Sequence, residues 1–488
     1  MKMQNNYYTA GLLVVGIIVR LMSFQSGFMF TNDVNLFQSW GQDLYVIGFS
    51  RFYATVHFCD YPPGFLYYLY VIGWLNARFG WDRLSTALNI FTFIPAMIAD
   101  LGIGYIIYRV VAYSRLIRPK DAGKPGDLPI EVTIKALVMS ALWVFNPAVI
   151  LISSVWGQVE SIFVIFLMLS LLLLREKKLM ASYLLFAVAI IIKAQSLFLA
   201  PVYLYSAFAY LVDNLIITGA DGSKTRVVLW WNAFTGEEPT PGPWGHPGAK
   251  FALWGRRKHG IKIAPVAWLW LIAAMLLSAV LIALLMLPFA QGFNIMPVVR
   301  LYTGGLGTYP FTSVNAFNFW GLVTNVGYSW THLEPHHVAA GVIITVMLTF
   351  GTIAALYRDH TRYGGKHCFF IVGALLALIF IFSVRMHERY LFPALAFFVL
   401  YYAETRKRRI FVLYTALSVT FFFNCTEIIR WLRAGAHGSG VLVTSGPILS
   451  FANTVIGVII LFMLLSTKWM SPAKTTPVSK VKAKARRK

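Results

Sequence analysis

The sequence predicts an all-α, polytopic integral membrane protein, and three observations support this class. Of the 488 residues, 58% are hydrophobic and only 12% are charged, and the mean hydropathy is +0.66. A soluble domain of this size needs more polar surface to cover its core. Many apolar runs approach the roughly 20 residues that cross a bilayer as a helix. These runs are continuous, so they lack the alternation of a transmembrane β-barrel.

About twelve transmembrane helices are predicted from these apolar runs. They lie near residues 8–30, 84–108, 130–152, 159–174, 179–192, 197–212, 263–287, 336–357, 367–384, 390–403, 410–427 and 447–466. With the N-terminus inside, the basic loops between them fall on the cytoplasmic side, as the positive-inside rule requires. The net charge of +23 is therefore explained by topology and does not indicate nucleic-acid binding.

The chain divides into one transmembrane domain and a basic tail. The expected boundaries are 1–466 for the domain, with a first outer loop at 31–83, a cytoplasmic loop at 213–262 and an outer loop at 288–335, and 467–488 for the cytoplasmic tail. The first outer loop is expected to hold two amphipathic helices at the membrane interface. The 213–262 loop is rich in Gly, Pro and Trp and shows no helix or strand period. The three cysteines are isolated, so neither a disulfide framework nor a zinc site is indicated.

Acidic residues stand at the outer ends of several apolar segments. Asp33, in the stretch TND, follows the first segment and is either the N-cap of the next helix or a carboxylate tuned for base chemistry. Asp60 precedes a Pro-Pro turn. Trp156, Gln158 and Glu160 occupy a hairpin, SSVWGQVES, that is expected to turn them toward one cavity. For Asp60 and Glu160, an ion pair that holds loops together is the alternative to a binding role.

A cationic cluster is predicted on the same outer side. Its members are Lys193, Arg385, His387 and Arg389, with Glu388 placed to neutralise or orient one arginine. If the segment is helical, Arg385 and Arg389 are one turn apart and face the same ligand. Such donors suit a phosphate ester on a lipid. Snorkelling of basic side chains to the interface is the alternative.

At these residues the chain resembles the GT-C superfamily of polyprenyl-phosphate-sugar-dependent glycosyltransferases. TNDVNLFQSW resembles the acidic first outer loop of that superfamily, and CDYPPG with IPAMIADLGIGYIIYR resembles stretches of the glucosyltransferases that extend lipid-linked oligosaccharides. VWGQVES, IIKAQSLFLAP and RMHERYLFPAL resemble patterns of bacterial mannosyltransferases related to GPI mannosyltransferase II. Two positions depart from the pattern, Ala194 where relatives often have Pro and Asn32 where many have a second acid.

The resemblance implies an inverting hexosyltransferase of the extracytoplasmic or lumenal side. It would move a hexose, with mannose favoured and glucose possible, from a polyprenyl phosphate to an acceptor hydroxyl of a glycolipid, glycan or protein. Asp33 would be the general base. The donor phosphate would be bound by Lys193, Arg385, His387 and Arg389, and the sugar or acceptor by Asp60, Trp156, Gln158, Glu160 and Glu388. No cofactor or divalent metal is implied.

Two other function classes remain open on the sequence alone. A transporter or lipid flippase also places charges inside a helical bundle, but its polar groups are expected to spread to the bilayer midplane. A scaffold or sensor gives no reason for acids and cations to gather on one side. The compact size favours a prokaryotic plasma membrane.

Overall fold

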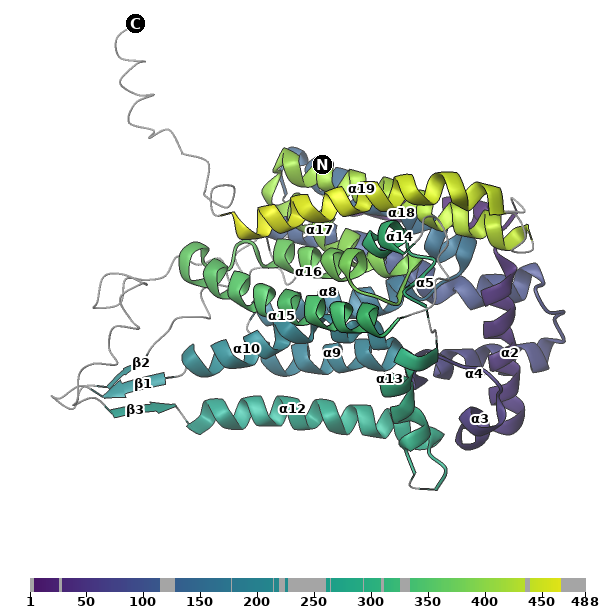
Figure 1. Ribbon diagram of the computed structural model, residues 1–488, viewed down its shortest axis with the longest axis horizontal. Helices are drawn as coiled ribbons and strands as arrows, with labels where there is room; N and C mark the ends of the chain where they lie inside the picture. The colour runs from purple at the N-terminus through teal and green to yellow at the C-terminus, as the bar shows by residue number, and fades with distance from the viewer. Residues whose placement is uncertain are drawn as a thin grey trace, which may run out of the picture.

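The computed structural model describes most of the chain as packed helices. The described residues are 4–25, 29–114, 128–176, 178–213, 215–218, 224–226, 260–263, 265–292, 294–308, 311–324, 334–434 and 439–466. Most long helices run side by side along one axis, α2 stands across the bundle at one end, and a small sheet lies at the other end (Figure 1). The predicted all-α, polytopic membrane class is confirmed.

The first half of the chain supplies the helices that carry most of the predicted site. They are α1 (Gln4–Gln25), α2 (Thr31–Ile47), α3 (Phe49–Thr55), α4 (Pro63–Phe79), α5 (Thr86–Tyr113), α6 (Ile130–Val144), α7 (Pro147–Ile150), the π-helix η2 (Leu151–Trp156), α8 (Glu160–Arg175), α9 (Leu179–Ile192), the 3-10 helix η3 (Ala194–Leu199) and α10 (Ala200–Asp213). The two helices of the predicted first outer loop correspond in position to α2 and α4.

The second half completes the bundle. It contains α12 (Pro265–Met286), η5 (Leu287–Phe289), α13 (Met296–Thr308), α14 (Phe319–Val323), α15 (Pro335–Tyr363), α16 (Cys368–Phe382), η6 (Glu388–Leu391), α17 (Phe392–Thr405), α18 (Arg408–Arg433) and α19 (Ser439–Leu465). Helix α16 is hydrophobic all round and α17 nearly so, and both are buried along almost their whole length, which makes them the centre of the core.

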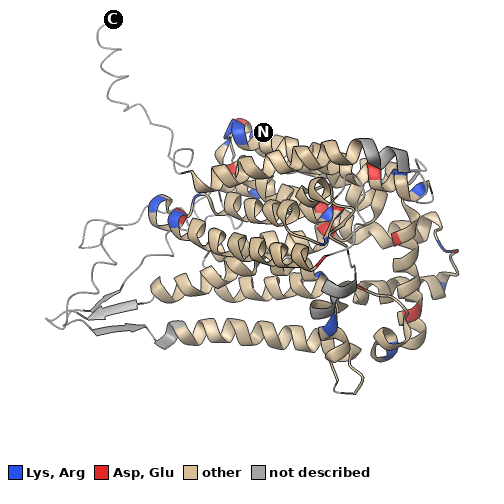
Figure 2. Cartoon of the chain, viewed as in Figure 1, with Lys and Arg blue, Asp and Glu red and all other residues tan. Residues whose placement is uncertain are grey.

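Six described helices are long and apolar enough to cross a membrane, or seven if the bent pair Ile130–Val144 and Pro147–Trp156 forms one span. Three further apolar helices are shorter. The prediction of about twelve spans therefore stays a prediction. Helices α12, α15 and α19 expose rows of large apolar side chains, as helices that face lipid do. Figure 2 shows these helices almost free of charge, with charged residues mainly near helix ends.

The predicted cytoplasmic loop is framed by short strands. β1 (Leu215–Thr218) pairs in antiparallel register with β2 (Lys224–Arg226) and with β3 (Gly260–Ile263). The ends of this loop form strands although its sequence shows no strand period, because pairing between strands does not require an alternating pattern. Residues 227–259 and the tail at 467–488 lie outside the described residues.

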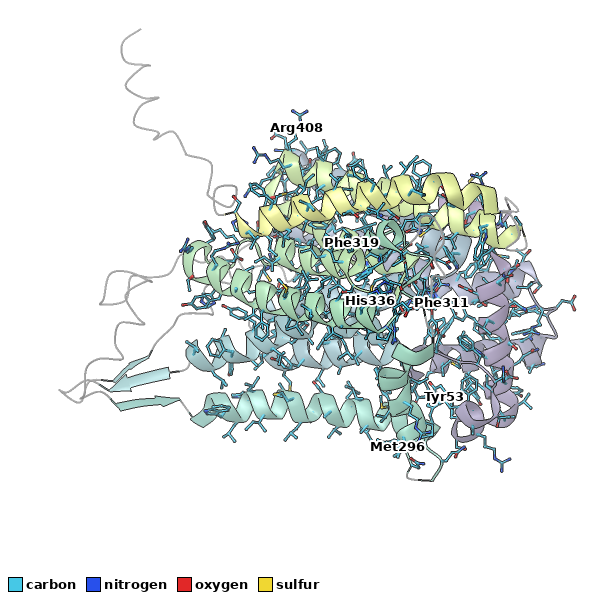
Figure 3. All side chains as sticks on the ribbon, viewed as in Figure 1. Tyr53, Met296, Phe311, Phe319, His336 and Arg408 are labelled. Carbon is cyan, nitrogen blue, oxygen red and sulfur yellow. The ribbon has the colours of Figure 1, made fainter. Side chains whose placement is uncertain are left out.

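A buried segment inside the predicted outer loop 288–335 supports the site. β4 (Ser313–Val314) pairs in parallel with β5 (Met386–His387), and Val314 lies opposite His387. Asn424 of α18 accepts a hydrogen bond from Phe317 N and donates one to Asn315 O. Irregular backbone in a membrane protein must be satisfied by protein groups, and these contacts supply that need. Figure 3 places Phe311 and Phe319, near the ends of this segment, in the same region as His336 of α15.

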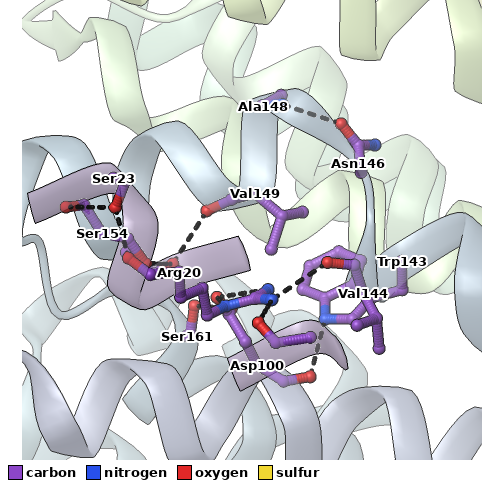
Figure 4. A network of polar contacts seen from close by, with 12 residues as sticks. Arg20, Ser23, Asp100, Trp143, Val144, Asn146, Ala148, Val149, Ser154 and Ser161 are labelled. Carbon is purple, nitrogen blue, oxygen red and sulfur yellow. Dashed lines mark hydrogen bonds and ion pairs between the residues drawn. The ribbon is translucent and has the colours of Figure 1, made fainter. Parts of the chain in front are cut away.

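A buried ion pair joins four helical segments in the bundle (Figure 4). Both amino acids, Arg20 of α1 and Asp100 of α5, are completely buried. The guanidinium donates to Asp100 Oδ2 through Nε at 3.1 Å and Nη2 at 3.0 Å, and to the carbonyls of Gly16 and Val144. Ser161 of α8 donates to the other carboxylate oxygen of Asp100. Because both charges are paired with partners inside this cluster, we interpret the cluster as structural.

Helices α2 and α4 cross at two glycines. A Cβ atom on Gly73 would lie 2.0 Å from the carbonyl oxygen of Gly41, so the backbones touch at this point. We expect Gly73→Ala to push the helices apart and lower the free energy of unfolding by about 1–3 kcal/mol, measured by thermal unfolding in detergent. Gly11→Ala is the control, because a Cβ there meets nothing within 4 Å. Equal effects of the two substitutions would contradict this account of the crossing.

Candidate functional site

Asp33 lies in the first turn of α2 and points to a neighbouring hairpin. The helix begins at Thr31, and its N-cap is Phe30. The alternative in which Asp33 is the N-cap is therefore wrong, because the helix starts two residues before it. The half-buried carboxylate instead accepts hydrogen bonds from Trp156 Nε1, at 2.8 Å, and from Gln158 Nε2.

A tight turn after η2 presents these two donors. Gly157 adopts a φ of 76°, and a Cβ atom there would lie 1.9 Å from the Phe93 ring, so the turn requires glycine. The turn places Trp156 on one side and Gln158 on the other. Gln158 also accepts a hydrogen bond at 3.1 Å from the hydroxyl of Tyr61, the residue before the Pro-Pro turn. The first outer loop and the hairpin are thus joined by side-chain hydrogen bonds.

Two buried carboxylates hold the cations of the site. Glu160, at the start of α8, forms an ion pair with the Lys193 ammonium, and its Oε1 atom lies 3.5 Å from Arg389 Nε. Arg389 Nη1 donates to Glu388 Oε1 at 2.7 Å. Both carboxylates are completely buried. Lys193 also lies 5.5 Å from the centre of the Tyr61 ring, which links these ion pairs to the Asp33 hydrogen bonds.

We call these eight residues the polar network. Its members are Asp33, Tyr61, Trp156, Gln158, Glu160, Lys193, Glu388 and Arg389. They come from segments up to 356 positions apart in the chain, namely α2, the loop before α4, the turn after η2, α8, the end of α9 and η6. The predicted acidic and cationic clusters therefore meet in one place.

Asp60 and His387 lie beside the polar network, and Arg385 stands two positions before His387 in the chain. Asp60 is half-buried and interacts electrostatically with Lys193 and Tyr61. His387 is buried, and burial together with the neighbouring Arg389 and Lys193 charges lowers its pKa well below the usual 6.5. The ring is therefore neutral at pH 7. Lowering the pH would add a third positive charge beside two cations, so protonation is disfavoured.

The predicted helical spacing of Arg385 and Arg389 is wrong. Arg385 adopts a φ of 61°, its N–H donates to Thr312 O at 2.7 Å, and strand β5 follows it directly. Helical geometry begins again only at Glu388. The two arginines are thus separated by a strand and do not form an i, i+4 pair. No ion pair of Arg385 occurs among the described residues.

Sequence reasoning missed two important side chains. Tyr61 lies inside the stretch CDYPPG, and its position between Asp60 and the prolines was the available signal. Arg20 lies in the first apolar segment, where a lone arginine is costly in lipid and signals a buried partner. Its partner Asp100 is 80 positions away, so the sequence does not show that the two residues pair.

The comparison with known families decides between the function classes. The family model described as "GPI transamidase subunit PIG-U" matches residues 22–296, more than half of the chain. The chain belongs to the PIG-U family. No curated protein matches it. The matched range includes the polar-network residues from Asp33 to Lys193, whereas Glu388 and Arg389 lie beyond it.

The family membership corrects several expectations. The assignment to the GT-C glycosyltransferases is wrong, and so are the hexosyltransferase activity, the polyprenyl-phosphate-sugar donor and the transporter or flippase alternative. The roles of base, donor-phosphate binding and sugar-acceptor binding given to the site residues fall with that activity. The multi-pass membrane location stands, and the prokaryotic plasma membrane is unsupported.

The geometry explains why the short motifs misled. The cations that suggested a phosphate site are paired with Glu160 and Glu388, so they are largely neutralised inside the protein. Within the described ranges, no group of three His, Cys, Asp or Glu side chains could hold a metal ion. The expectation that neither a metal nor a cofactor is needed stays a prediction.

Proposed function

We propose that the chain is a multi-pass subunit of the GPI transamidase of the endoplasmic reticulum membrane, and that the polar network binds the head group of the GPI lipid. The match to the PIG-U family over residues 22–296 carries this proposal. The partners are other transamidase subunits and the proteins that receive the anchor. We also propose that the polar network lies on the lumenal side of the membrane.

The described residues favour a binding role over acyl transfer. A cysteine nucleophile needs a depressed pKa, because the thiolate attacks. Burial instead raises the pKa of the Cys59 thiol, the cysteine nearest to the polar network in sequence. Its Sγ atom lies 3.8 Å from Tyr61 O, an inert hydrogen-bonded position. We therefore assign amide exchange to another subunit and substrate binding to this chain.

The arrangement of charges suits a polar lipid head group. Two carboxylates and two cations are held beside Tyr61 and Trp156, whose rings can pack against a sugar face. Asp33 and Asp60 are half-buried and connect the buried ion pairs to the surface. Exposed apolar faces of α12 and α15 can receive the acyl chains of the same lipid.

A cell-based experiment tests this function. Cells that lack the chain are expected to accumulate a reporter protein without its GPI anchor, and expression of the tagged chain is expected to restore surface display. Capture through the tag is expected to isolate transamidase subunits with it. Normal anchoring in cells without the chain, or capture of no such subunit, would overturn the proposal.

A further inference from the structure

The polar network carries more acids than bases. Its ionisable side chains and their neighbours comprise the carboxylates Asp33, Asp60, Glu160 and Glu388 and the cations Lys193, Arg385 and Arg389, with His387 neutral. One carboxylate remains in excess even when the half-buried Arg385 is counted. A buried site with excess negative charge is stabilised by a bound cation.

Among the carboxylate oxygens of the polar network, two are buried without a hydrogen-bond partner. They are Glu160 Oε2 and Glu388 Oε2, and both side chains are completely buried. The other oxygen of each carboxylate is engaged by Lys193 or Arg389. The unpartnered donor of the network, Arg389 Nε, lies 3.5 Å from Glu160 Oε1, the oxygen that Lys193 already engages. Buried acceptors without a donor are costly, so we take this geometry to indicate that a donor is supplied from outside the chain.

The chemistry of the missing partner follows from these oxygens. A carboxylate only accepts hydrogen bonds, so its partner must donate. An ionised phosphate is an anion, so the excess negative charge would repel it. It is also a hydrogen-bond acceptor and cannot donate to the two free oxygens. A primary ammonium has three donors and one positive charge, and hydroxyl groups add further donors.

We propose that the polar network recognises a protonated primary amine on a hydroxyl-rich head group, with Glu160 Oε2 and Glu388 Oε2 as its acceptors. This inference rests on the proposed function, because a transamidase forms a new amide and its lipid acceptor must carry an amine. An ammonium held by carboxylates is not nucleophilic. The network therefore serves recognition of the head group, and the reaction takes place elsewhere.

Amphiphiles with one alkyl tail and different heads test this chemistry. The full chain, captured in detergent with its associated proteins, is titrated at pH 7 with a dodecyl glucosaminide, its N-acetylated form and dodecyl phosphate. We expect the free amine to bind at least about 10-fold more tightly than the N-acetyl compound, in line with hydrogen bonds to charged groups. Equal binding, or tightest binding by the phosphate, would overturn the inference; equal binding would mean that water fills the site.

Matched variants test whether the preference for the free amine depends on the two carboxylate oxygens. Glu388→Gln is expected to reduce the amine preference to about 2-fold or less, whereas Glu131→Gln, at an exposed position of α6, should leave it unchanged. If Glu388→Gln fails to fold, Glu160→Gln, which alters the other acceptor, replaces it against the same control. An undiminished preference in the folded network variant contradicts the inference. Because binding is measured directly, an amine preference can stand even if the cell-based test of the transamidase role fails.

Discussion

Replacement of Arg20 by methionine is expected to destabilise the protein more than any other single change considered. The substitution leaves the Asp100 carboxylate completely buried without its ion-pair partner. Removing one member of a buried pair typically costs about 3–5 kcal/mol. Thermal unfolding in detergent should therefore show a large fall in the midpoint for Arg20→Met.

A double variant separates the charge from the shape of the Arg20 side chain. Arg20→Met with Asp100→Leu removes both charges and is expected to recover a large part of the lost stability, because buried pairs are often replaceable by apolar residues. Arg51→Met, at an exposed position of α3, is the control. A midpoint for Arg20→Met that matches the control would show that the pair does not hold the bundle together.

The second large effect is expected at Lys193. Lys193→Met removes the ammonium that pairs with the buried Glu160. Arg389 Nε, at 3.5 Å from the same oxygen, compensates partly, so we expect a loss near the lower end of the range for buried pairs, about 3 kcal/mol. Thermal unfolding again provides the measurement.

The partner substitution tests the cause of that loss. Lys193→Met with Glu160→Gln neutralises both groups and should be more stable than Lys193→Met alone. Lys135→Met, exposed on α6, should behave like the unaltered protein. If the double variant is no more stable than the single one, the loss is due to packing of the lysine stem and the ion-pair account is wrong.

The membrane class could be predicted from the sequence because it depends on composition and on the length of apolar runs, both of which are local. The meeting of Asp33, Glu160 and Arg389 could also be predicted, since each stands at the end of an apolar segment on the same expected side. The structure brings them together through Gln158 and Lys193.

The contacts that decide function could not be predicted in the same way. The sequence indicates that Glu388 can neutralise a neighbouring arginine, but it does not reveal that Glu160 pairs with Lys193 and Arg389, which are 33 and 229 positions away. Without these pairs the cations resemble a phosphate site, which favoured a glycosyltransferase. The interruption of helical geometry at Arg385 could not be predicted either, because a strand of two residues leaves no pattern in the sequence.

Photo-crosslinking from inside the site tests the central claim most directly. Tyr390, whose ring lies 5.2 Å from that of His387, is replaced by benzoylphenylalanine, and Tyr45, exposed on α2, is replaced in a control. Cells are labelled with tritiated inositol, which enters the GPI lipid, and their membranes are irradiated. We predict inositol label on the chain crosslinked from position 390 and little from position 45. Equal labelling from both positions, or none from position 390 in a folded and assembled protein, would contradict binding of the GPI head group at the polar network.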